Sequence, residues 1–355
     1  MPEYVSSALA ELLARLFESA GLPADDARLC GDWLTDAEAS GVASHGIARV
    51  SMYLDALRRG KIAARPVITV EQSRPGVLMV DGGNGMGPVV GAVAIDRAMA
   101  AASATGIAVA AVRHSNHYGA AGYLLQRAAR AGHAAFTCSN GSPVMAVWGG
   151  AEPLLGTNPL AAAFPAAESR NALSFDMATS VAAFGRIRQA QRRGEAIPAD
   201  WAVGPDGAAT TDPAEAMRGA LLPVGGAKGS ALALMVEMLA GVLTGAAIGP
   251  AVGNPNDAST AAADVGHAFI VIDPEAFMPR HRYEDRAAQL GDRVRRARPA
   301  AGVGAVRLPG SGASARRDAA ARHGLALADE TAELLAKELA KIGLDLPPPV
   351  TSAII

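Results

Sequence analysis

Cysteine is scarce in this chain of 355 residues. Its two cysteines, Cys30 and Cys138, lie far apart without the spacing of a disulfide framework or a metal site, so we expect a reduced, cytoplasmic location. Neither sign of charge is in excess, because 32 Lys and Arg stand against 34 Asp and Glu, giving a net charge of -2. No stretch combines clustered basic residues with aromatics, which make up only 4% of the chain. Nucleic acid is therefore not an expected partner.

The sequence also lacks the patterns of a signal peptide and of a membrane span. The first twenty residues carry Glu3 and Glu11 at helical spacing and have no basic start followed by an apolar run. The most apolar stretch, residues 230–253, holds Glu237 near its middle and evenly spaced glycines in its second half. These features favour a buried core helix followed by a loop, with no membrane contact.

Half of the residues are hydrophobic, and a chain of this length predicts about two globular domains. Apolar periodicity predicts helices over residues 5–19, 24–39, 47–59, 88–102, 181–193, 228–243, 283–296 and 330–341, and one ending at 131. Strands are expected at residues 77–80, 107–112, 134–138, 173–176, 267–272 and 302–307. Strand and helix alternate, which indicates an α/β fold. The long stretch 140–165 has little periodicity and is expected to be a functional loop.

The densest group of reactive side chains follows the second expected helix. Ser44, His45 and Arg49 bring a hydroxyl, an imidazole and a guanidinium within five residues of one another. Histidine can exchange a proton near neutral pH, and a guanidinium offers a planar fork that matches a carboxylate. The group therefore suits reduction of a 2-keto or 2-imino acid, with Ser44 orienting the ring. The alternative is a helix end with a satisfied histidine and a solvated arginine.

The glycine-rich segment at residues 80–91 can be compared with the Rossmann fingerprint for dinucleotide binding. Gly85 and Gly87 are followed by a glycine at 91 and not at 90, and Pro88 removes one amide that would face a pyrophosphate. The next strand ends in Arg113 and not in an acidic residue that would hold a ribose. A structural turn is the better interpretation.

Residues 113–123 lie where a buried strand ends and a helix begins, the place where α/β proteins bind ligands. Amides at residues 119–121 are expected to meet an anionic phosphate, and the small side chains there allow close approach. His114 and His117 have no neighbouring carboxylate or cysteine, so cofactor contact is favoured over a metal, and no metal site is predicted. The alternative is a capped helix with polar ends.

Four further segments place polar groups at the edges of apolar runs. Thr157 precedes Asn-Pro in a tight turn and could donate to a substrate carboxylate, although Asn-Pro is also an ordinary turn. Asp176 could accept from an imidazole or a ribose, or cap the helix that follows. Lys228 lies at a helix start behind glycines, where a cation opposes the helix dipole unless an anion is nearby. Residues 308–312 form a loop suited to a phosphate or to a turn.

Together these segments resemble the malate/L-lactate dehydrogenase family of the second type. This family also includes ureidoglycolate, sulfolactate and diketogulonate dehydrogenases and the piperideine/pyrroline-2-carboxylate reductases. The matching motifs are Ser-His-Gly-x-x-Arg at 44–49, Ser-Asn-His-Tyr-Gly-Ala-Ala-Gly-Tyr at 115–123, Gly-Thr-Asn-Pro at 156–159, Asp-Met-Ala-Thr-Ser at 176–180 and Gly-Gly-x-Lys-Gly at 225–229. They occur in order along nearly the whole chain.

The resemblance implies a non-Rossmann dinucleotide-binding α/β domain with a mixed sheet and flanking helices, over residues 76–309. It also implies a helical domain built from both chain ends, residues 1–75 and 310–355, and a homodimer. His45 would be the proton donor, assisted by Ser44 and with Asp176 completing the relay, while Arg49 and Thr157 would bind substrate. The residues implied to line an NAD or NADP site are His117, Tyr118, Gly119, Ala120, Ala121, Phe175, Asp176, Met177, Lys228, Pro309, Gly310, Ser311 and Gly312.

The chain departs from the family where the pattern Leu-Pro-Gly-Glu-Arg is common, because residues 308–312 lack both charges. The expected activity is an NAD(P)-dependent interconversion of a small 2-hydroxy acid and its 2-keto acid. Two alternatives stay open. One is a cyclic imino acid reductase, to which residues 228–237 look similar. The other is a non-catalytic dinucleotide-binding protein in which the polar segments act only as caps.

Overall fold

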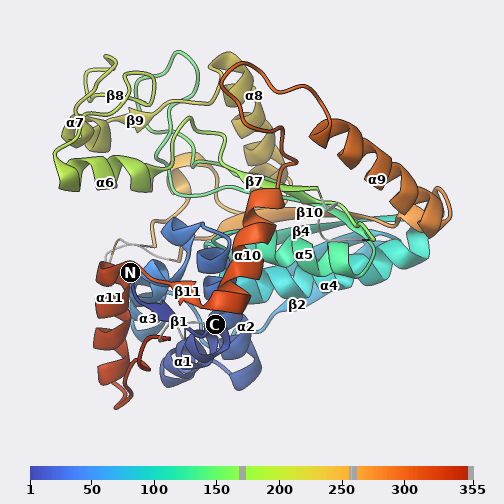
Figure 1. Cartoon of the computed structure of the whole chain (residues 1–355), viewed down its shortest axis with the longest axis horizontal. Helices are drawn as coiled ribbons and strands as arrows, with labels where there is room; N and C mark the ends of the chain where they lie inside the picture. Colours follow the sequence, from blue (N-terminus) through green and yellow to red (C-terminus); the bar gives the residue numbers. More distant parts are fainter. Residues whose placement is uncertain (168–172, 256, 258–261, 351–355) are drawn as a thin grey trace.

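A seven-stranded mixed sheet forms the centre of the computed structural model, which describes residues 1–355 except 168–172, 256, 258–261 and 351–355 (Figure 1). In spatial order the strands are β2 (Thr69–Arg74), β3 (Val77–Asp81), β4 (Ile107–Ser115), β10 (Val265–Ile272), β5 (Ala134–Ser139), β6 (Leu160–Ala163) and β7 (Ser174–Met177). β3 and β4 run parallel, and the other neighbours in this sheet are antiparallel. A Rossmann sheet is parallel. The expected non-Rossmann α/β fold is therefore confirmed.

Helices cover both faces of this sheet. α4 (Gly87–Thr105) and α5 (Gly122–Arg130) pack on one face, where alanines at 94, 98 and 102 let α4 approach closely. On the other face lie α8 (Ala227–Val236) and a π-helical turn, Glu237–Val242. The alternation along β10 matches this layering: Phe269 packs in the core under α4, and Ala268 packs in the core under the π turn.

A helical unit built from both ends of the chain lies beside the sheet, where blue and red elements meet in Figure 1. Its elements are α1 (Ser6–Ser19), α2 (Ala24–Ala39), α3 (Val50–Arg58), α10 (Ser311–His323), α11 (Asp329–Ala340) and the paired strands β1 (Glu3–Tyr4) and β11 (Leu325–Ala326). Its apolar core is contiguous and contains the buried aromatics Phe17, Trp33 and Tyr53. The expected helical portion formed by both chain ends is confirmed.

A smaller layer lies at the outer end of the sheet and has a core of its own around Met145, Ile187 and Leu221. It consists of α6 (Phe184–Arg193), α7 (Pro213–Arg218), β8 (Ala202–Val203) and β9 (Ala220–Leu221). α9 (Arg280–Arg295) runs along the outside. In the described part of the chain, none of the helices has the length and apolar character needed to cross a bilayer.

Several local predictions need correction. Residues 302–307 form no strand, because Gly302 has a positive φ and these residues are almost all exposed, so no apolar face is available for pairing. The expected loop 140–165 contains β6, and the expected helix 228–243 changes from α to π at Glu237. Helix α10 was not predicted. β2 belongs to the sheet, so the boundary that we propose between the two domains lies before residue 69 and not at 75.

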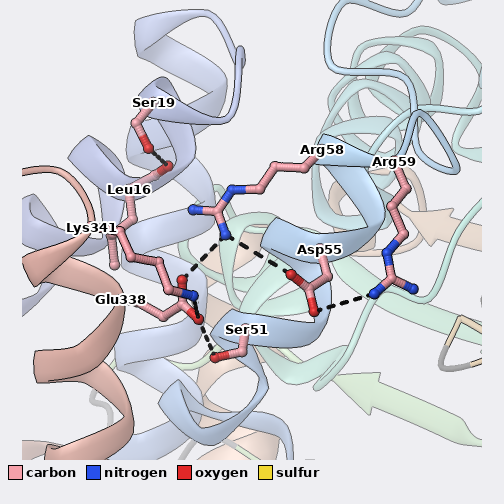
Figure 2. Close-up of polar contacts among 8 residues, drawn as sticks. All are labelled: Leu16, Ser19, Ser51, Asp55, Arg58, Arg59, Glu338 and Lys341. Carbon is pink, nitrogen blue, oxygen red and sulfur yellow. Dashed lines mark hydrogen bonds and ion pairs between the residues drawn. The ribbon is translucent and has the colours of Figure 1, made fainter.

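A buried carboxylate anchors α3 to α11 (Figure 2). Glu338 Oε1 accepts from Ser51 Oγ at 3.0 Å and from Lys341 Nζ at 2.7 Å, and its Oε2 accepts from Arg58 Nη1 at 3.3 Å. Burial alone would raise the pKa of Glu338, but these bonds outweigh it and hold the pKa below its ordinary value. The C-terminal helix thereby fixes the helix that follows residues 44–49.

We expect Glu338→Gln to lower the free energy of unfolding at neutral pH by about 1–3 kcal/mol, because Lys341 and Arg58 lose their charged acceptor. The depressed pKa means that this stability is present above the ordinary carboxylate pKa and is lost as the pH falls through the folded value. Urea unfolding of both proteins over a range of pH should therefore show a difference that narrows in acid. Glu333→Gln, at an exposed site on the same helix, is the control and should leave stability unchanged. A difference in the free energy of unfolding that persists in acid would contradict the role of the Glu338 carboxylate as an anchor.

Candidate active site

The segment with Ser44, His45 and Arg49 consists of two 3-10 turns, Ala43–His45 and Ile47–Arg49, joined by Gly46. Glu38 at the end of α2 stabilises this bend, because its Oε2 accepts from the Ile47 amide at 3.0 Å. A Cβ at position 46 would overlap the same carboxylate oxygen. Burial raises the pKa of Glu38, and the amide bond opposes that rise. A side chain at position 46 would therefore displace the carboxylate that accepts from Ile47. With glycine there, Glu38 fixes the bend between His45 and Arg49.

Within this segment the three predicted groups contact one another. Ser44 Oγ lies 2.9 Å from His45 Nδ1, and Arg49 Nε donates to the Ser44 carbonyl at 2.7 Å. Burial, and then the charge of Arg49, lowers the pKa of His45 to about 4. The imidazole is thus neutral at physiological pH. Among the residues that the structure describes, no carboxylate forms an ion pair with Arg49.

His117, in the loop that follows β4, lies beside His45. Its ring stacks on that of His45, with centroids 5.6 Å apart, and its Nδ1 lies 2.7 Å from Tyr53 Oη on α3. Burial, followed by the charges of His45 and Arg49, lowers the pKa of His117 well below its ordinary value. Two neutral imidazoles therefore lie beside one guanidinium. Tyr53 was not predicted as a site residue, although its position one turn from Arg49 on α3 was a usable signal.

The sequence had suggested that the backbone amides at the start of α5 are free to bind a phosphate. In the structure some of them are already bonded within the protein. Asp176 Oδ2, from β7, accepts from the Gly122 amide at 3.0 Å, and the Ala121 amide also interacts with this carboxylate. Burial raises the pKa of Asp176, and these amides oppose the rise. The structure therefore gives Asp176 to the N-terminus of α5, which it caps from a neighbouring strand.

The cofactor segments implied by the family resemblance come together around β7. The Ser174 amide donates to the Pro309 carbonyl at 3.2 Å, and a Cβ at Gly310, whose φ is +89°, would overlap Ser174 Oγ. The loop Pro309–Gly312 therefore lies beside Phe175–Met177, and β7 in turn contacts α5. Met177 is exposed here. These segments thus lie together at the edge of the sheet, beside the start of α5.

Tyr118 departs from the expectation for a cofactor contact. Its side chain is 2% exposed and stacks on the buried His267 at 4.3 Å between centroids, inside the sheet layer. His267 in turn is held between the hydroxyls of Ser115 and Ser139, each 2.9 Å away. Tyr118 therefore belongs to the core. It lies in the loop after β4, and the polar residues around it gave no sign that its ring turns inward.

Thr157 and Lys228 belong to a cluster just beyond the end of β7. The Thr157 carbonyl accepts from the backbone amide and the Oγ1 of Thr179, both at 2.9 Å, and the Val224 amide donates to the Thr179 carbonyl at 2.8 Å. Lys228 lies exposed in the first turn of α8, next to this point. No group of three or more His, Cys, Asp or Glu side chains suited to one metal ion occurs among the described residues.

A family model described as malate/L-lactate dehydrogenase matches residues 5–336. The chain belongs to the malate/L-lactate dehydrogenase family. It is therefore an oxidoreductase, as the sequence predicted.

Named relatives within this family differ in substrate. The chain is 41% identical over 283 residues to a delta(1)-pyrroline-2-carboxylate reductase of Ancylobacter novellus, covering 78% of this chain and 82% of the relative. It is 38% identical to a (2R)-3-sulfolactate dehydrogenase (NADP(+)) of Chromohalobacter salexigens, covering 78% and 83%. It is 34% identical to a ureidoglycolate dehydrogenase (NAD(+)) of Escherichia coli, covering 92% and 93%. The solved sulfolactate dehydrogenase of Methanocaldococcus jannaschii superposes with a TM-score of 0.89 at 34% identity, covering 97% and 98%.

The charge of Arg49 can be tested directly through His45. Arg49→Gln removes a positive charge that disfavours the imidazolium, so the pKa of His45 should rise above about 4. It should stay below 6.5, because burial is the larger cause and is retained. Ring resonances of His45, assigned by loss in His45→Gln, give the pKa by NMR titration. Arg59→Gln removes an exposed cation from the end of α3 and should have no effect, whereas an unchanged pKa in Arg49→Gln would refute the coupling.

Proposed function

We propose that this protein interconverts a small 2-hydroxy acid and its 2-keto acid with NAD or NADP, and that His45 exchanges the proton. The observation that carries the proposal is the pairing of a neutral imidazole with a guanidinium that has no carboxylate partner in the described chain. A 2-keto acid presents a carboxylate next to a carbonyl oxygen. Arg49 matches the carboxylate, and His45 matches the carbonyl oxygen.

The edge around β7 fits a nicotinamide dinucleotide in chemical character. Exposed Met177 and partly exposed Phe175 offer apolar surface to a flat ring. Lys228 supplies an exposed cation for a phosphate. When bound, the cofactor supplies or accepts the hydride. The choice between NAD and NADP is part of the experiment below.

The residues around His45 account for proton exchange in both directions. In the free enzyme the low pKa keeps the ring deprotonated, so it can accept the hydroxyl proton of a 2-hydroxy acid. A substrate carboxylate on Arg49 offsets the positive charge that lowers this pKa. The pKa of His45 then rises, and the ring can carry a proton to the carbonyl oxygen in the reverse direction. Ser44 holds Nδ1, which leaves Nε2 for the substrate.

A cyclic 2-imino acid is the second candidate, and the specific support for it is the 41% identity to a pyrroline-2-carboxylate reductase. Such a substrate carries the same carboxylate and replaces the carbonyl oxygen with an imine nitrogen. Arg49 and His45 would serve it in the same way. Substrate selection then depends on side chains beyond the carboxylate.

A substrate panel distinguishes these two candidates. Oxidation of NADH and of NADPH is followed by absorbance with pyruvate, oxaloacetate, sulfopyruvate, 2,3-diketogulonate and the cyclic imines piperideine- and pyrroline-2-carboxylate. We expect turnover with a keto acid and a preference for one nucleotide. Turnover with the imines alone would overturn the hydroxy acid assignment, and binding of nucleotide without any turnover would overturn both.

On the preferred substrate, His45→Ala should lower kcat by about 10²–10⁴-fold, the usual contribution of a general acid or base. The cofactor Kd, measured by the fluorescence of bound NADH or NADPH, should change little. His281→Ala, at an exposed histidine on α9, is the control and should keep full activity. Near-full activity of His45→Ala would exclude the proposed proton exchange.

A further inference from the structure

One buried carboxylate has no part in the mechanism above. Glu237 lies in the long apolar segment that follows Lys228 and is 7% exposed. A carboxylate removed from water is costly unless hydrogen bonds satisfy its oxygens. The local sequence gives no reason for it, since residues 231–236 and 238–243 are all apolar or small. Its function must lie in the groups that it contacts.

The two oxygens of Glu237 bind two separate segments. Oε2 accepts from Asn158 Nδ2 at 2.8 Å, in the turn that carries Thr157. Oε1 accepts from the Gly249 amide at 2.7 Å, at the start of the 3-10 turn Gly249–Ala251. One carboxylate therefore joins the helix to both segments, each through a donor of its own.

Asn158 needs such support because its backbone conformation is unfavourable. Its φ is +37°, its side chain is fully buried, and Pro159 follows it. Residues in the left-handed region other than glycine persist where their surroundings hold them, and they concentrate at functional sites. Asn158 Nδ2 also donates to the Ala233 carbonyl at 3.0 Å, while Thr179 Oγ1 donates to the Asn158 carbonyl at 3.2 Å. The turn is thus clamped from α8 on one side and from the end of β7 on the other.

The helix itself changes at the same residue. The α-helical pattern ends at Val236, and the π-helical turn begins at Glu237. Such turns are rare and are frequently found at functional sites. The irregular helix, the left-handed asparagine and the buried acid therefore meet at one point, next to Thr157.

We propose that Glu237 is a positioning residue for substrate binding: by holding Asn158 it fixes the turn that presents Thr157 to the substrate carboxylate. This inference rests on the proposed function, in which Thr157 contacts substrate. Glutamine cannot replace the acid, because both oxygens accept from donors and an amide has only one oxygen. In Glu237→Gln an NH2 group would face either Asn158 Nδ2 or the Gly249 amide.

The test uses steady-state kinetics on the full chain with the acid that gives the highest turnover in the panel. Oxamate, an unreactive mimic of a 2-keto acid, serves as a competitive inhibitor. Glu237→Gln should raise the KM of the acid and the Ki of oxamate about tenfold or more, because a displaced positioning group weakens every substrate contact that depends on it. The Kd of NADH or NADPH, measured by fluorescence, should stay within twofold of wild type. Glu284→Gln on α9 controls for the loss of a charge.

A second variant distinguishes positioning from folding. In Asn158→Asp with Glu237→Gln, the glutamine can donate to the new carboxylate and still accept from the Gly249 amide. The bond from residue 158 to the Ala233 carbonyl is lost in this variant, so KM and Ki should return part of the way to wild type. An effect on Tm alone, with KM and Ki unchanged in Glu237→Gln, would overturn the inference. So would the absence of any recovery in a double variant that is folded by circular dichroism.

A third variant, Thr157→Val, separates two possible failures: that of the positioning role of Glu237 and that of the substrate role of Thr157. A raised KM in Thr157→Val with an unchanged KM in Glu237→Gln leaves the substrate role of Thr157 standing and overturns the positioning role of Glu237 alone. An unchanged KM and Ki in Thr157→Val would overturn the substrate role itself, and the inference with it.

Discussion

The candidate site depends on one contact between the helical unit and the sheet. The indole of Trp33, on α2, fills the space that a side chain at position 119 would occupy, so Gly119 with its φ of +58° lies directly against it. Trp33 packs edge-on against Tyr53 at 5.3 Å, and Tyr53 binds His117, two residues before that glycine. This aromatic pair connects the loop after β4 to the segment with His45. If the two units moved apart, both imidazoles would lose the arrangement that keeps them neutral.

Several buried carboxylates of this molecule hold nearby loops and helices in place through hydrogen bonds, each with different donors. Glu38 accepts from the Ile47 amide and sets the bend at Gly46, while Glu338 brings together a serine, a lysine and an arginine to hold α3. Glu237 reaches across to the turn at Asn158. The cationic Arg49, in contrast, binds a backbone carbonyl and keeps its charge unneutralised. The structure thus uses its acids for support and leaves a positive charge at the candidate site. Among the described residues no carboxylate pairs with that arginine, so its guanidinium is available to an anion.

The sequence predicted what depends on neighbours along the chain. Helical spacing predicted α1 and α2, and the proximity of Ser44, His45 and Arg49 predicted their contacts, because a short turn brings such residues together. It could not show that Tyr53 and His117 meet, since 64 residues separate them and the contact forms only when the two units pack. Asp176 was expected either to accept from an imidazole or a ribose or to cap the helix that follows it. It accepts from the first amide of α5, a helix more than 50 residues earlier in the chain, which spacing along the sequence could not show. The strand predicted at residues 302–307 was wrong for a related reason. An apolar pattern indicates a strand, but the strand forms only where a neighbouring strand is available to pair with it.

The antiparallel pairing of β1 with β11 places Tyr4 opposite Leu325 and gives the chain an order of assembly during synthesis. The core that α1 and α2 share with α11 cannot close until the ribosome has added about 300 further residues after α2, which takes roughly 15–60 s at usual elongation rates. The sheet, whose last strand ends at Ile272, can be complete before then. The nascent chain can therefore hold a complete sheet while the apolar faces of its first two helices stay uncovered. The turn with His45 follows the second of these helices, so the candidate site takes its final form only after α11 has been added.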